Sequence, residues 1–414
     1  MEVKPGYKQT EAGIIPADWH AERLADIGRF SKGLGIKKDE SLSGTIPCIR
    51  YGEIYTHHNY VIKRFNSFIS SEVAKTSQKL NMGDILFAGS GETKEEIGKA
   101  VAFTQQVEAY AGGDIVILTP KSTNSTYLGY ALNSPAVIRQ KASKGQGDAV
   151  VHISPHSLGE VVLPIPSQSE QSAIAMTLSD MDALLESLNS LIAKKRAIKQ
   201  ATMQQLLSGE TRLSGHKGKW HTKQLGELCE IRSGGTPSTS DKSAWSGEIP
   251  WCTPTDITAL NGKKYLSQTS RTITEHGLRT SSAELIPKNS IIMTTRATIG
   301  ECAINLVPMA TNQGFKNIIP SNQIDTEFLY YLLSIHKQNL ACLASGSTFL
   351  EIGKEQLRQI TLFIPRSKEE QTDISNTIGD MDSEIEALNR NIEKKTSIKQ
   401  AMMQELLTGR TRLI

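Results

Sequence analysis

The sequence predicts an α+β protein in which two similar globular domains are joined by two long helices. These helices are expected to form an intramolecular antiparallel coiled coil, so that the chain is pseudo-two-fold symmetric. Two observations carry the prediction. The segment from Asp180 to Leu213 returns almost verbatim as Asp380 to Leu413, and both copies place apolar residues alternately three and four positions apart. A repeat of that length indicates duplicated architecture.

Both copies of the repeat begin with Asp-Met-Asp, continue through Lys-Lys and Ile-Lys-Gln-Ala, and end with Thr-Arg-Leu. Weaker matches precede each copy: Trp19-His20 with Trp220-His221, Gly33 with Gly234, Ile46-Pro47 with Ile249-Pro250, and Ile97-Gly98 with Ile299-Gly300. Each half is therefore one variable domain followed by one helix. The predicted segments are a first domain at 1–165, a first helix at 166–213, a second domain at 214–364 and a second helix at 365–414.

The helix boundaries follow from proline and glycine. Pro166 and Pro365 precede the helices, and Gly209 and Gly409 follow them, as start and stop rules predict. Helices of this length make a rod of about 60 Å. The apolar seam consists of Leu178, Met181, Leu185, Leu188 and Ile192 in the first copy, and Ile378, Met381, Ile385, Leu388 and Ile392 in the second.

Both seams need an apolar partner, and pairing within one chain is the simplest way to bury them. Pairing between two chains is the alternative. An antiparallel pair would place the two domains at opposite ends of the rod, so that one polypeptide mimics a symmetric dimer.

Composition excludes several classes of protein. The chain has 414 residues and a net charge of +3, from 46 basic and 43 acidic residues, so any basic face would have to come from local clustering. The five cysteines lie singly, which argues against a disulfide framework or a zinc site and favours buried thiols. With no apolar leader and no long apolar run, we expect a soluble cytoplasmic protein with no membrane contact.

The variable domains mix short β-rich runs with helical segments. The expected strands are Asp84 to Phe87, Ile115 to Thr119, Ser290 to Thr294 and Lys316 to Ile319, and the expected helices are Tyr127 to Gln140 and Glu327 to Leu343. Polar loops rich in glycine, hydroxyl and amide residues lie between them, at 87–95, 143–149, 233–243, 294–301 and 311–317. Such side chains suit hydrogen bonds to base edges and phosphates, although the same residues also make ordinary turns.

Basic, amide and hydroxyl side chains in matched loops are the candidate DNA contacts. Arg50 and Thr253 follow the matched Ile-Pro pairs, while Lys94 and Arg296 precede the matched Ile-Gly pairs. The full set is Arg50, Tyr51 and Lys94 in the first domain, and Thr253, Arg296, Asn312, Gln313 and Lys316 in the second. Off-seam helix residues could instead contact partner proteins or the DNA backbone, or simply be solvated: Lys194, Arg196, Lys199, Arg390 and Lys394.

We predict no catalytic residue and no metal site in this chain. A Pro-Pro-aromatic methyltransferase motif is missing. Asp84 with Glu92 and Lys94 resembles a metal-dependent nuclease array, but the position matching Asp84 is Ser290. The 91–100 segment has the wrong glycine spacing for a phosphate loop, and the pairs His57/His58 and His152/His156 have no third ligand.

The chain resembles the specificity subunit of type I restriction-modification systems. The resemblance is carried by the helix ends Leu-Leu-Ser-Gly-Glu-Thr-Arg-Leu and Leu-Leu-Thr-Gly-Arg-Thr-Arg-Leu, by Ile-Pro followed by Glu-Gln before each helix (Glu170-Gln171 and Glu370-Gln371), and by the opening segment from Gly6 to His20.

This resemblance implies two target recognition domains, each reading one half of a bipartite double-stranded DNA site, and a coiled coil that sets the unread spacer. It also implies two methyltransferase (modification) subunits and motor-nuclease (restriction) subunits as partners. S-adenosylmethionine, ATP and Mg²⁺ would then bind those partners, leaving this chain without a cofactor and non-catalytic. Two alternatives are a coiled-coil scaffold that does not read DNA and a self-contained DNA methyltransferase or nuclease.

Overall fold

The computed structural model describes residues 4–296, 298–343 and 351–413. The chain divides into two compact units, Met1–Asn189 with Arg390–Ile414, and Ser190–Asn389. Unit 1 thus contains the first domain, the first part of the first long helix and the last part of the second. Unit 2 contains the second domain, the last part of the first long helix and the first part of the second. The units differ from the four predicted segments because each long helix contributes to both.

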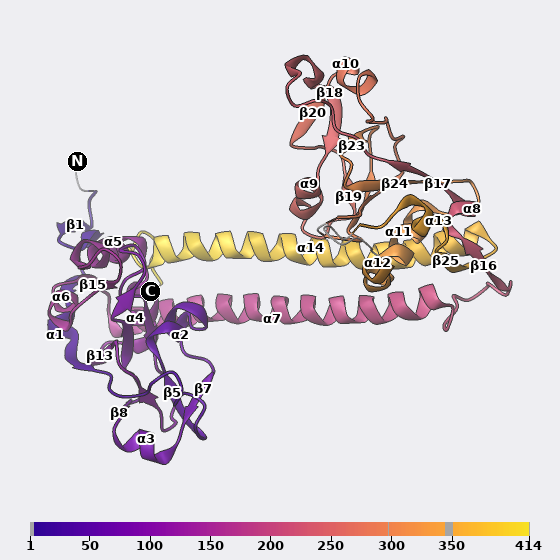
Figure 1. Ribbon diagram of the computed structural model, residues 1–414. Coiled ribbons are helices and arrows are strands. Elements are labelled where there is room, and N and C mark those ends of the chain that lie inside the picture. The colour runs from indigo at the N-terminus through magenta and orange to yellow at the C-terminus, as the bar shows by residue number, and fades with distance from the viewer. Residues whose placement is uncertain (1–3, 297, 344–350, 414) are drawn as a thin grey trace. The chain divides into compact units, whose positions relative to one another are not determined.

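Unit 1 is built on a five-stranded sheet of order β4-β13-β9-β11-β6, next to a four-stranded sheet of order β7-β5-β12-β8 (Figure 1). Smaller pairs are β1-β2, β15-β3 and β10-β14. The strands are β1 Tyr7–Thr10, β2 Gly13–Pro16, β3 His20–Arg23, β4 Gly28–Lys32, β5 Ile46–Ile49, β6 Tyr60–Val61, β7 Ser67–Ile69, β8 Gln78–Lys79, β9 Ile85–Ala88, β10 Ser90–Gly91, β11 Ala100–Ala102, β12 Tyr110–Ala111, β13 Ile115–Pro120, β14 Val151–His152 and β15 Val162–Ile165.

Unit 2 repeats this topology with strands β17-β24-β21-β22-β19, β20-β18-β23 and β16-β25. The central strands match one for one, with β4, β13 and β9 corresponding to β17, β24 and β21. The strands are β16 Trp220–Gln224, β17 Cys229–Ser233, β18 Trp245–Cys252, β19 Tyr265–Leu266, β20 Arg271–Ile273, β21 Ile291–Thr294, β22 Cys302–Asn305, β23 Ala310–Thr311, β24 Phe315–Pro320 and β25 Thr361–Pro365. All four predicted strands are therefore confirmed, within one or two residues.

Short helices connect and cover the sheets. In unit 1 they are α1 Leu24–Ile27, α2 Tyr51–Thr56, α3 Ser71–Lys75, α4 Ser125–Ala131, α5 Pro135–Lys144 and α6 Pro155–Gly159. In unit 2 they are α8 Leu225–Leu228, η1 Lys242–Ala244, α9 Pro254–Ala259, α10 Glu275–Arg279, α11 Thr326–Ile335, α12 Lys337–Leu343 and α13 Lys354–Arg358. The single helix predicted from Tyr127 to Gln140 is wrong: it divides before Pro135, because proline cannot continue the preceding helix. The helix predicted from Glu327 to Leu343 likewise divides, at His336.

The long helices are α7 Gln168–Ser208 and α14 Lys368–Leu406. Each is followed by a glycine with positive φ, Gly209 at +77° and Gly409 at +69°, which is the left-handed position that commonly terminates a helix. None of the ten seam residues is exposed. Leu178, Ile192, Ile378 and Ile385 are fully buried.

The two long helices run antiparallel in each unit. In unit 1, Lys399 of α14 donates to Asp182 of α7 at 2.5 Å. In unit 2, Lys195 of α7 donates to Glu384 of α14 at 2.9 Å. Late residues of one helix therefore contact early residues of the other, and the predicted fold class is confirmed.

The end of each helix is part of the core of the unit it enters. Met403, Leu406 and Leu407 of α14 pack in the unit 1 core with Trp19, and Leu206 and Leu207 of α7 pack in the unit 2 core against Trp220. Each domain thus has an apolar core completed by the helix that follows the other domain. The cysteines are free thiols; Cys48, Cys229 and Cys252 are buried, whereas Cys342 is exposed, contrary to the expectation for all five. No helix among the described residues could span a membrane.

Candidate nucleic-acid interface

Strand register aligns the two domains residue by residue at one end of two inner strands of the five-stranded sheet, β9 with β13 in unit 1 and β21 with β24 in unit 2. Ala88 pairs with Ile115 in unit 1, and Thr294 pairs with Phe315 in unit 2. The next amide donates in the same way, Gly89 to the Asp114 carbonyl at 2.7 Å and Thr295 to the Gly314 carbonyl at 2.8 Å.

This register makes Ser90 the counterpart of Arg296. The matched Ile-Gly pair that Lys94 and Arg296 precede is confirmed, because Gly98 and Gly300 donate to the equivalent carbonyls of Ala88 and Thr294. Counted from the strands, however, Ser90 and not Lys94 is the counterpart of Arg296, because Gly98 follows Ser90 by eight residues whereas Gly300 follows Arg296 by four. The first domain has a longer loop here, and Lys94 lies in it, exposed to solvent.

In unit 2 two cations surround one carboxylate at this end of the strands. Glu351 Oε2 lies 2.9 Å from Nε and 2.7 Å from Nη2 of Arg296, and its Oε1 lies 3.1 Å from Nζ of Lys316. Burial alone would raise the pKa of Glu351, but hydrogen bonds from Arg296 and Lys316 hold that pKa below its usual value. The carboxyl group is therefore ionised at neutral pH. We call these three residues the unit 2 cluster; residue 297 of the neighbouring loop lies outside the described residues.

In unit 1 a cleft of about 250 Å³ lies at the same end of the strands. The hydroxyl of Ser90 and Nδ1 of His152 are 2.9 Å apart. Gln146 and His152 exchange two backbone hydrogen bonds, at 2.9 and 2.8 Å, so both side chains project from adjacent backbone. We call this the unit 1 cleft; its polar lining is Lys32, Ser90, Asp114, Lys144, Gln146, His152, Ser154 and Ser157.

A matched glycine shapes the backbone beside the unit 1 cleft and beside the unit 2 cluster. A Cβ at Gly33 would overlap the carbonyl oxygen of Gly112, and a Cβ at Gly234 would overlap that of Asn312. Only glycine permits this approach of two backbones. The sequence match between Gly33 and Gly234 thus reflects a shared steric requirement.

Arg50 and Thr253 occupy equivalent helix N-caps, of α2 and α9. Their backbone N–H groups donate to Glu53 at 3.0 Å and to Asp256 at 2.7 Å. Tyr51, the first residue of α2, is 40% exposed. The matched Ile-Pro pairs therefore mark a repeated capping turn, which the sequence comparison found without indicating its role.

Asn312 and Gln313 lie in the loop between β23 and β24. The side-chain oxygen of Asn312 accepts from Gly314 N at 2.9 Å and so fixes the turn, while the oxygen of Gln313 accepts from the Thr236 hydroxyl. Lys316 is only 6% exposed, so its ammonium group serves Glu351 before any external ligand.

The nuclease-like array does not assemble. Asp84 is buried and accepts hydrogen bonds from the Thr119 hydroxyl at 2.6 Å and from Asn81 N at 2.8 Å, while Glu92 and Lys94 are exposed. In unit 2 the matching residue is Ser290, whose backbone N–H donates to the Asn305 side chain at 2.8 Å. Asp84 is thus a turn-forming carboxylate, and burial raises its pKa. Within residues 4–296, 298–343 and 351–413, no three metal-ligating side chains converge.

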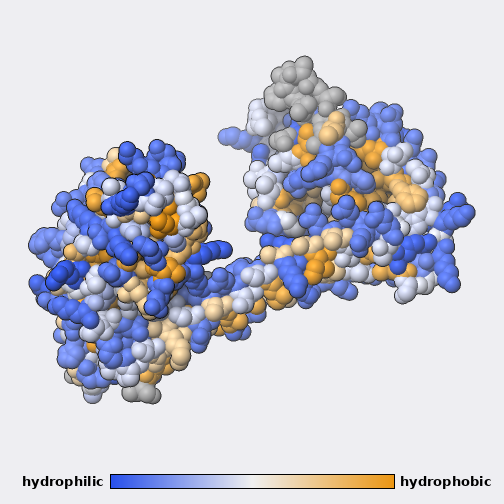
Figure 2. Space-filling view, turned by 90° about the horizontal axis from the view of Figure 1, so that it is seen from below, coloured by the Kyte–Doolittle hydropathy of each residue, from blue (hydrophilic) through white to orange (hydrophobic). Residues whose placement is uncertain are grey.

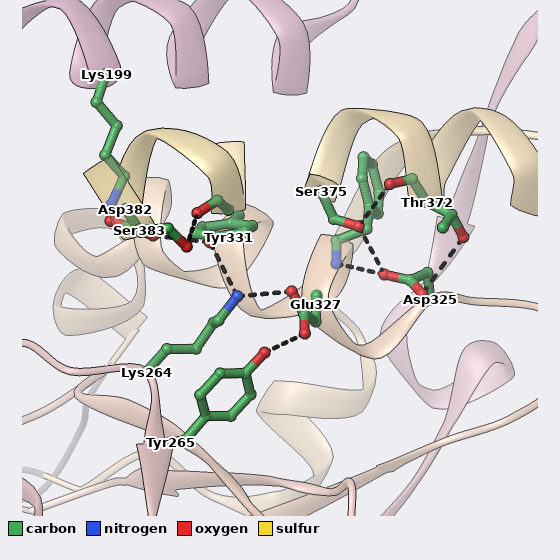
Figure 3. Close-up of polar contacts among 12 residues, drawn as sticks. Lys199, Lys264, Tyr265, Asp325, Glu327, Tyr331, Thr372, Ser375, Asp382 and Ser383 are labelled. Atoms are coloured by element: carbon green, nitrogen blue, oxygen red, sulfur yellow. Dashed lines mark hydrogen bonds and ion pairs between the residues drawn. The ribbon is translucent and has the colours of Figure 1, made fainter. Parts of the chain in front are cut away.

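A polar joint connects the unit 2 domain to both long helices (Figure 3). The Tyr331 hydroxyl donates to Asp382 of α14 at 2.7 Å, and Lys199 of α7 forms an ion pair with the same carboxylate. Lys264 donates to Glu327 at 2.6 Å and to the Tyr331 hydroxyl at 3.1 Å. Lys199 therefore faces the neighbouring helix, which corrects its assignment to an outer surface.

Unit 1 has the equivalent joint. Tyr130 donates to Asp182 at 2.7 Å, Lys399 donates to the same side chain at 2.5 Å, and its ammonium group lies 3.9 Å from the ring centre of Tyr60. The sequence contained the signal for this joint: the second aspartate of Asp-Met-Asp and the lysine of Ile-Lys-Gln-Ala are repeated off the seam. Its tyrosine partners had no comparable signal.

Comparison with known families gives two matches within this chain. The type I restriction modification DNA specificity domain matches residues 16–195 and again residues 217–396. The type I restriction enzyme MjaIX specificity subunit of Methanocaldococcus jannaschii is 38% identical over 189 residues, which is 45% of this chain and 42% of that protein. This match therefore spans less than half of that relative.

Other relatives match over the whole length. The putative type I restriction enzyme MjaX specificity subunit of the same organism is 25% identical over 98% of this chain and 97% of its own. The crystal structure of the type I restriction-modification S subunit from M. genitalium aligns with a TM-score of 0.59 at 16% identity, covering 98% of both chains. The repeated domain match, the shared fold and the duplicated helices agree: the chain belongs to the family of type I restriction-modification DNA specificity subunits.

Proposed function

We propose that this chain is the non-catalytic, DNA-reading subunit of a type I restriction-modification complex in the cytoplasm. Each domain reads one half of a split double-stranded DNA target. Two methyltransferase subunits bind the paired helices and each flips and methylates an adenine, and motor-nuclease subunits join the same complex. S-adenosylmethionine, ATP and Mg²⁺ are assigned to those partners.

The observation that carries this proposal is the pair of equivalent positions, the unit 1 cleft and the unit 2 cluster, with unlike side chains. The backbone is repeated closely enough to keep Gly33 and Gly234 at the same steric contact. The polar groups at the matched positions differ: Ser90 and His152 in unit 1, Arg296 and Glu351 in unit 2. Two readers of one construction and different chemistry suit a target with two different halves.

The long helices carry features expected of a docking surface. Met176, Leu184, Leu191 and Ile198 of α7 are between 39% and 64% exposed, and their spacing of seven or eight residues places them on one helix face. Figure 2 shows hydrophobic residues exposed along the helices. Exposed apolar residues in a row favour contact with another protein, here assigned to the methyltransferase subunits.

The proposal is tested by expressing the chain with its methyltransferase partner in a host that lacks adenine methylation and sequencing the methylated positions. We expect methylation at a single split sequence and none when either protein is missing. Methyl transfer or DNA cleavage by the purified chain alone would identify a self-contained enzyme. Failure to protect any split sequence from nuclease digestion, with the partners present, would instead favour a scaffold.

A domain exchange provides the matched control. Replacing residues 214–364 with the corresponding domain of a relative should change one half of the methylated sequence and preserve the other. A change in both halves would contradict the assignment of one half-site to each domain.

A further inference from the structure

We propose that the unit 1 cleft and the unit 2 cluster are the base-reading sites of this chain. Arg296 contacts the major-groove edge of a guanine in one half-site, and Gln146 with His152 reads a base pair in the other. The inference rests on the proposed function and deepens it by naming the residues that determine specificity.

The Arg296 guanidinium is held by one edge and open on the other. Nε and Nη2 face the same oxygen of Glu351, at 2.9 and 2.7 Å. Within the described part of the chain, no acceptor engages Nη1, and 44% of the side chain is exposed. Nη1 and the second hydrogen of Nη2 are therefore available together. Two parallel N–H donors match O6 and N7 of guanine.

Glu351 and Lys316 act as positioning residues for Arg296. The Lys316 side chain is 8% exposed and its ammonium lies 3.1 Å from Glu351 Oε1, so it contacts the carboxylate without reaching out of the protein. The two cations and one anion leave a local charge of +1, which favours an electron-rich base edge. A flexible arginine held in this way loses less conformational entropy when it binds.

The unit 1 cleft offers a different set of donors and acceptors. Ser90 is 4% exposed, and its hydroxyl engages Nδ1 of His152, which leaves Nε2 facing outward. The Gln146 side chain is exposed next to it. An amide of this kind pairs with the N6 and N7 atoms of adenine. Lys32 and Lys144 line the same cleft. Lys144 is paired with Glu160 at 2.5 Å, so we assign to Lys32 the positive charge for the phosphates that position the duplex.

The other matched loops lack this combination of features. At Arg50 and Thr253 the repeated groups cap helices, and Asn312 and Gln313 satisfy neighbours within their own loop. At the unit 1 cleft and the unit 2 cluster a repeated backbone presents different polar groups, Ser90 with His152 in one and Arg296 with Glu351 in the other. Variation on a constant frame is what two specificities from one duplicated domain require.

The test uses the complete methyltransferase, formed by the full-length chain and its partner, and reads out every methylated adenine in a host genome. The variants are Arg296→Ala and Glu351→Gln for unit 2, and Gln146→Ala and His152→Ala for unit 1. Two controls match them: Arg279→Ala, an exposed arginine of α10, and His156→Ala, an exposed histidine four residues from His152 that does not line the cleft.

For Arg296→Ala we expect discrimination to fall about 5- to 150-fold at one base pair, a G·C pair, with every other position unchanged. Glu351→Gln should relax the same base pair by less. Gln146→Ala and His152→Ala should relax one position in the opposite half-site, and the two controls should leave the recognised sequence intact.

The inference is overturned if the four variants recognise the same DNA sequence as the wild type. It is also overturned if Arg296→Ala weakens methylation equally at all sequences, since that result marks a phosphate contact. A folding defect is distinguished from a phosphate contact by the melting temperature of the purified variant, which the folding defect lowers and the loss of a phosphate contact does not. If the wild-type chain directs no methylation at any split sequence, the proposed function fails as well. If wild-type methylation is normal and only the variants behave otherwise, the inference alone fails.

Discussion

Arg412, after the end of α14, holds the buried carboxylate of Glu170 at the start of α7. Its Nε and Nη2 lie 2.6 and 2.8 Å from the two carboxylate oxygens, and the Glu170 side chain is only 1% exposed. Trp19 donates to the same carboxylate at 2.9 Å. Unit 2 repeats the arrangement with Arg212, Glu370 and Trp220. In each unit, the arginine that follows one long helix thus binds a buried glutamate in the first turn of the other long helix.

Removing the guanidinium should destabilise unit 1 strongly. Arg412→Ala leaves a buried carboxylate with too few partners, and breaking such a pair costs about 3 kcal/mol. The measurement is the free energy of unfolding from urea titration, together with hydrogen exchange in the first turns of α7. Arg410→Ala is the control, because Arg410 and Glu405 lie 3.6 Å apart with side chains 59% and 44% exposed. Equal losses for the two variants would contradict a special role for Arg412.

The joint in unit 2 should depend on the Tyr331 hydroxyl. Tyr331→Phe removes the donor to Asp382 and the acceptor for Lys264 while keeping the ring. We expect a loss of about 1–3 kcal/mol in the free energy of unfolding, because two charged groups, Asp382 and Lys264, each lose one hydrogen bond. Tyr330→Phe is the matched control, because the Tyr330 hydroxyl contacts Ser334 of its own helix, whereas that of Tyr331 contacts Asp382 of α14. A loss as large in Tyr330→Phe would point to ring packing instead.

The architecture was predictable because it depends on local and repeated patterns. Heptad spacing defined the seam from Leu178 to Ile192, and Gly209 and Gly409 marked the helix ends. The division of one predicted helix before Pro135 was also readable from the sequence, since the residue before proline rarely stays helical.

The sites depend on contacts that no local pattern reveals. Arg296 meets Glu351 across 55 residues, and Lys399 meets Asp182 across 217. Strand register decides that Ser90 matches Arg296, whereas the sequence match through the Ile-Gly pair ignored a loop of different length. Of the eight candidate DNA contacts, Arg296 and Lys316 both contact Glu351 in the unit 2 cluster. Arg50 and Thr253 instead occupy equivalent helix N-caps.

The steric role of Gly33 can be tested on its own. Gly33→Ala should destabilise unit 1 by about 3 kcal/mol, because the added methyl group overlaps the Gly112 carbonyl and forces two backbones apart. Gly52→Ala is the control, since a Cβ there meets nothing within 4 Å. Thermal unfolding of both variants gives the comparison. A wild-type melting temperature for Gly33→Ala would show that the strands separate without cost.

The buried Lys141 gives unit 1 a characteristic dependence on pH. Its side chain is 1% exposed and donates to the Gly98 carbonyl at 2.6 Å, and burial lowers its pKa to about 7. In the unfolded chain the pKa is near the ordinary value of 10.5. Between these values the unfolded state binds more protons, so this group's contribution to stability rises with pH from about 7 to about 10.5, by up to about 1.4 kcal/mol per pH unit.

The measurement is a comparison of Lys141→Met with the wild type across that range, because buried cysteine and tyrosine residues also titrate there with the opposite sign. The stability advantage of Lys141→Met should be largest at pH 7 and shrink steadily as the pH rises toward 10.5, because the wild-type lysine becomes neutral in both states only above that pH. Lys75→Met, at a lysine side chain 67% exposed, should show a difference from wild type that is independent of pH. A constant difference for Lys141→Met as well would mean that the buried amine keeps its ordinary pKa, with its charge stabilised by the Gly98 carbonyl.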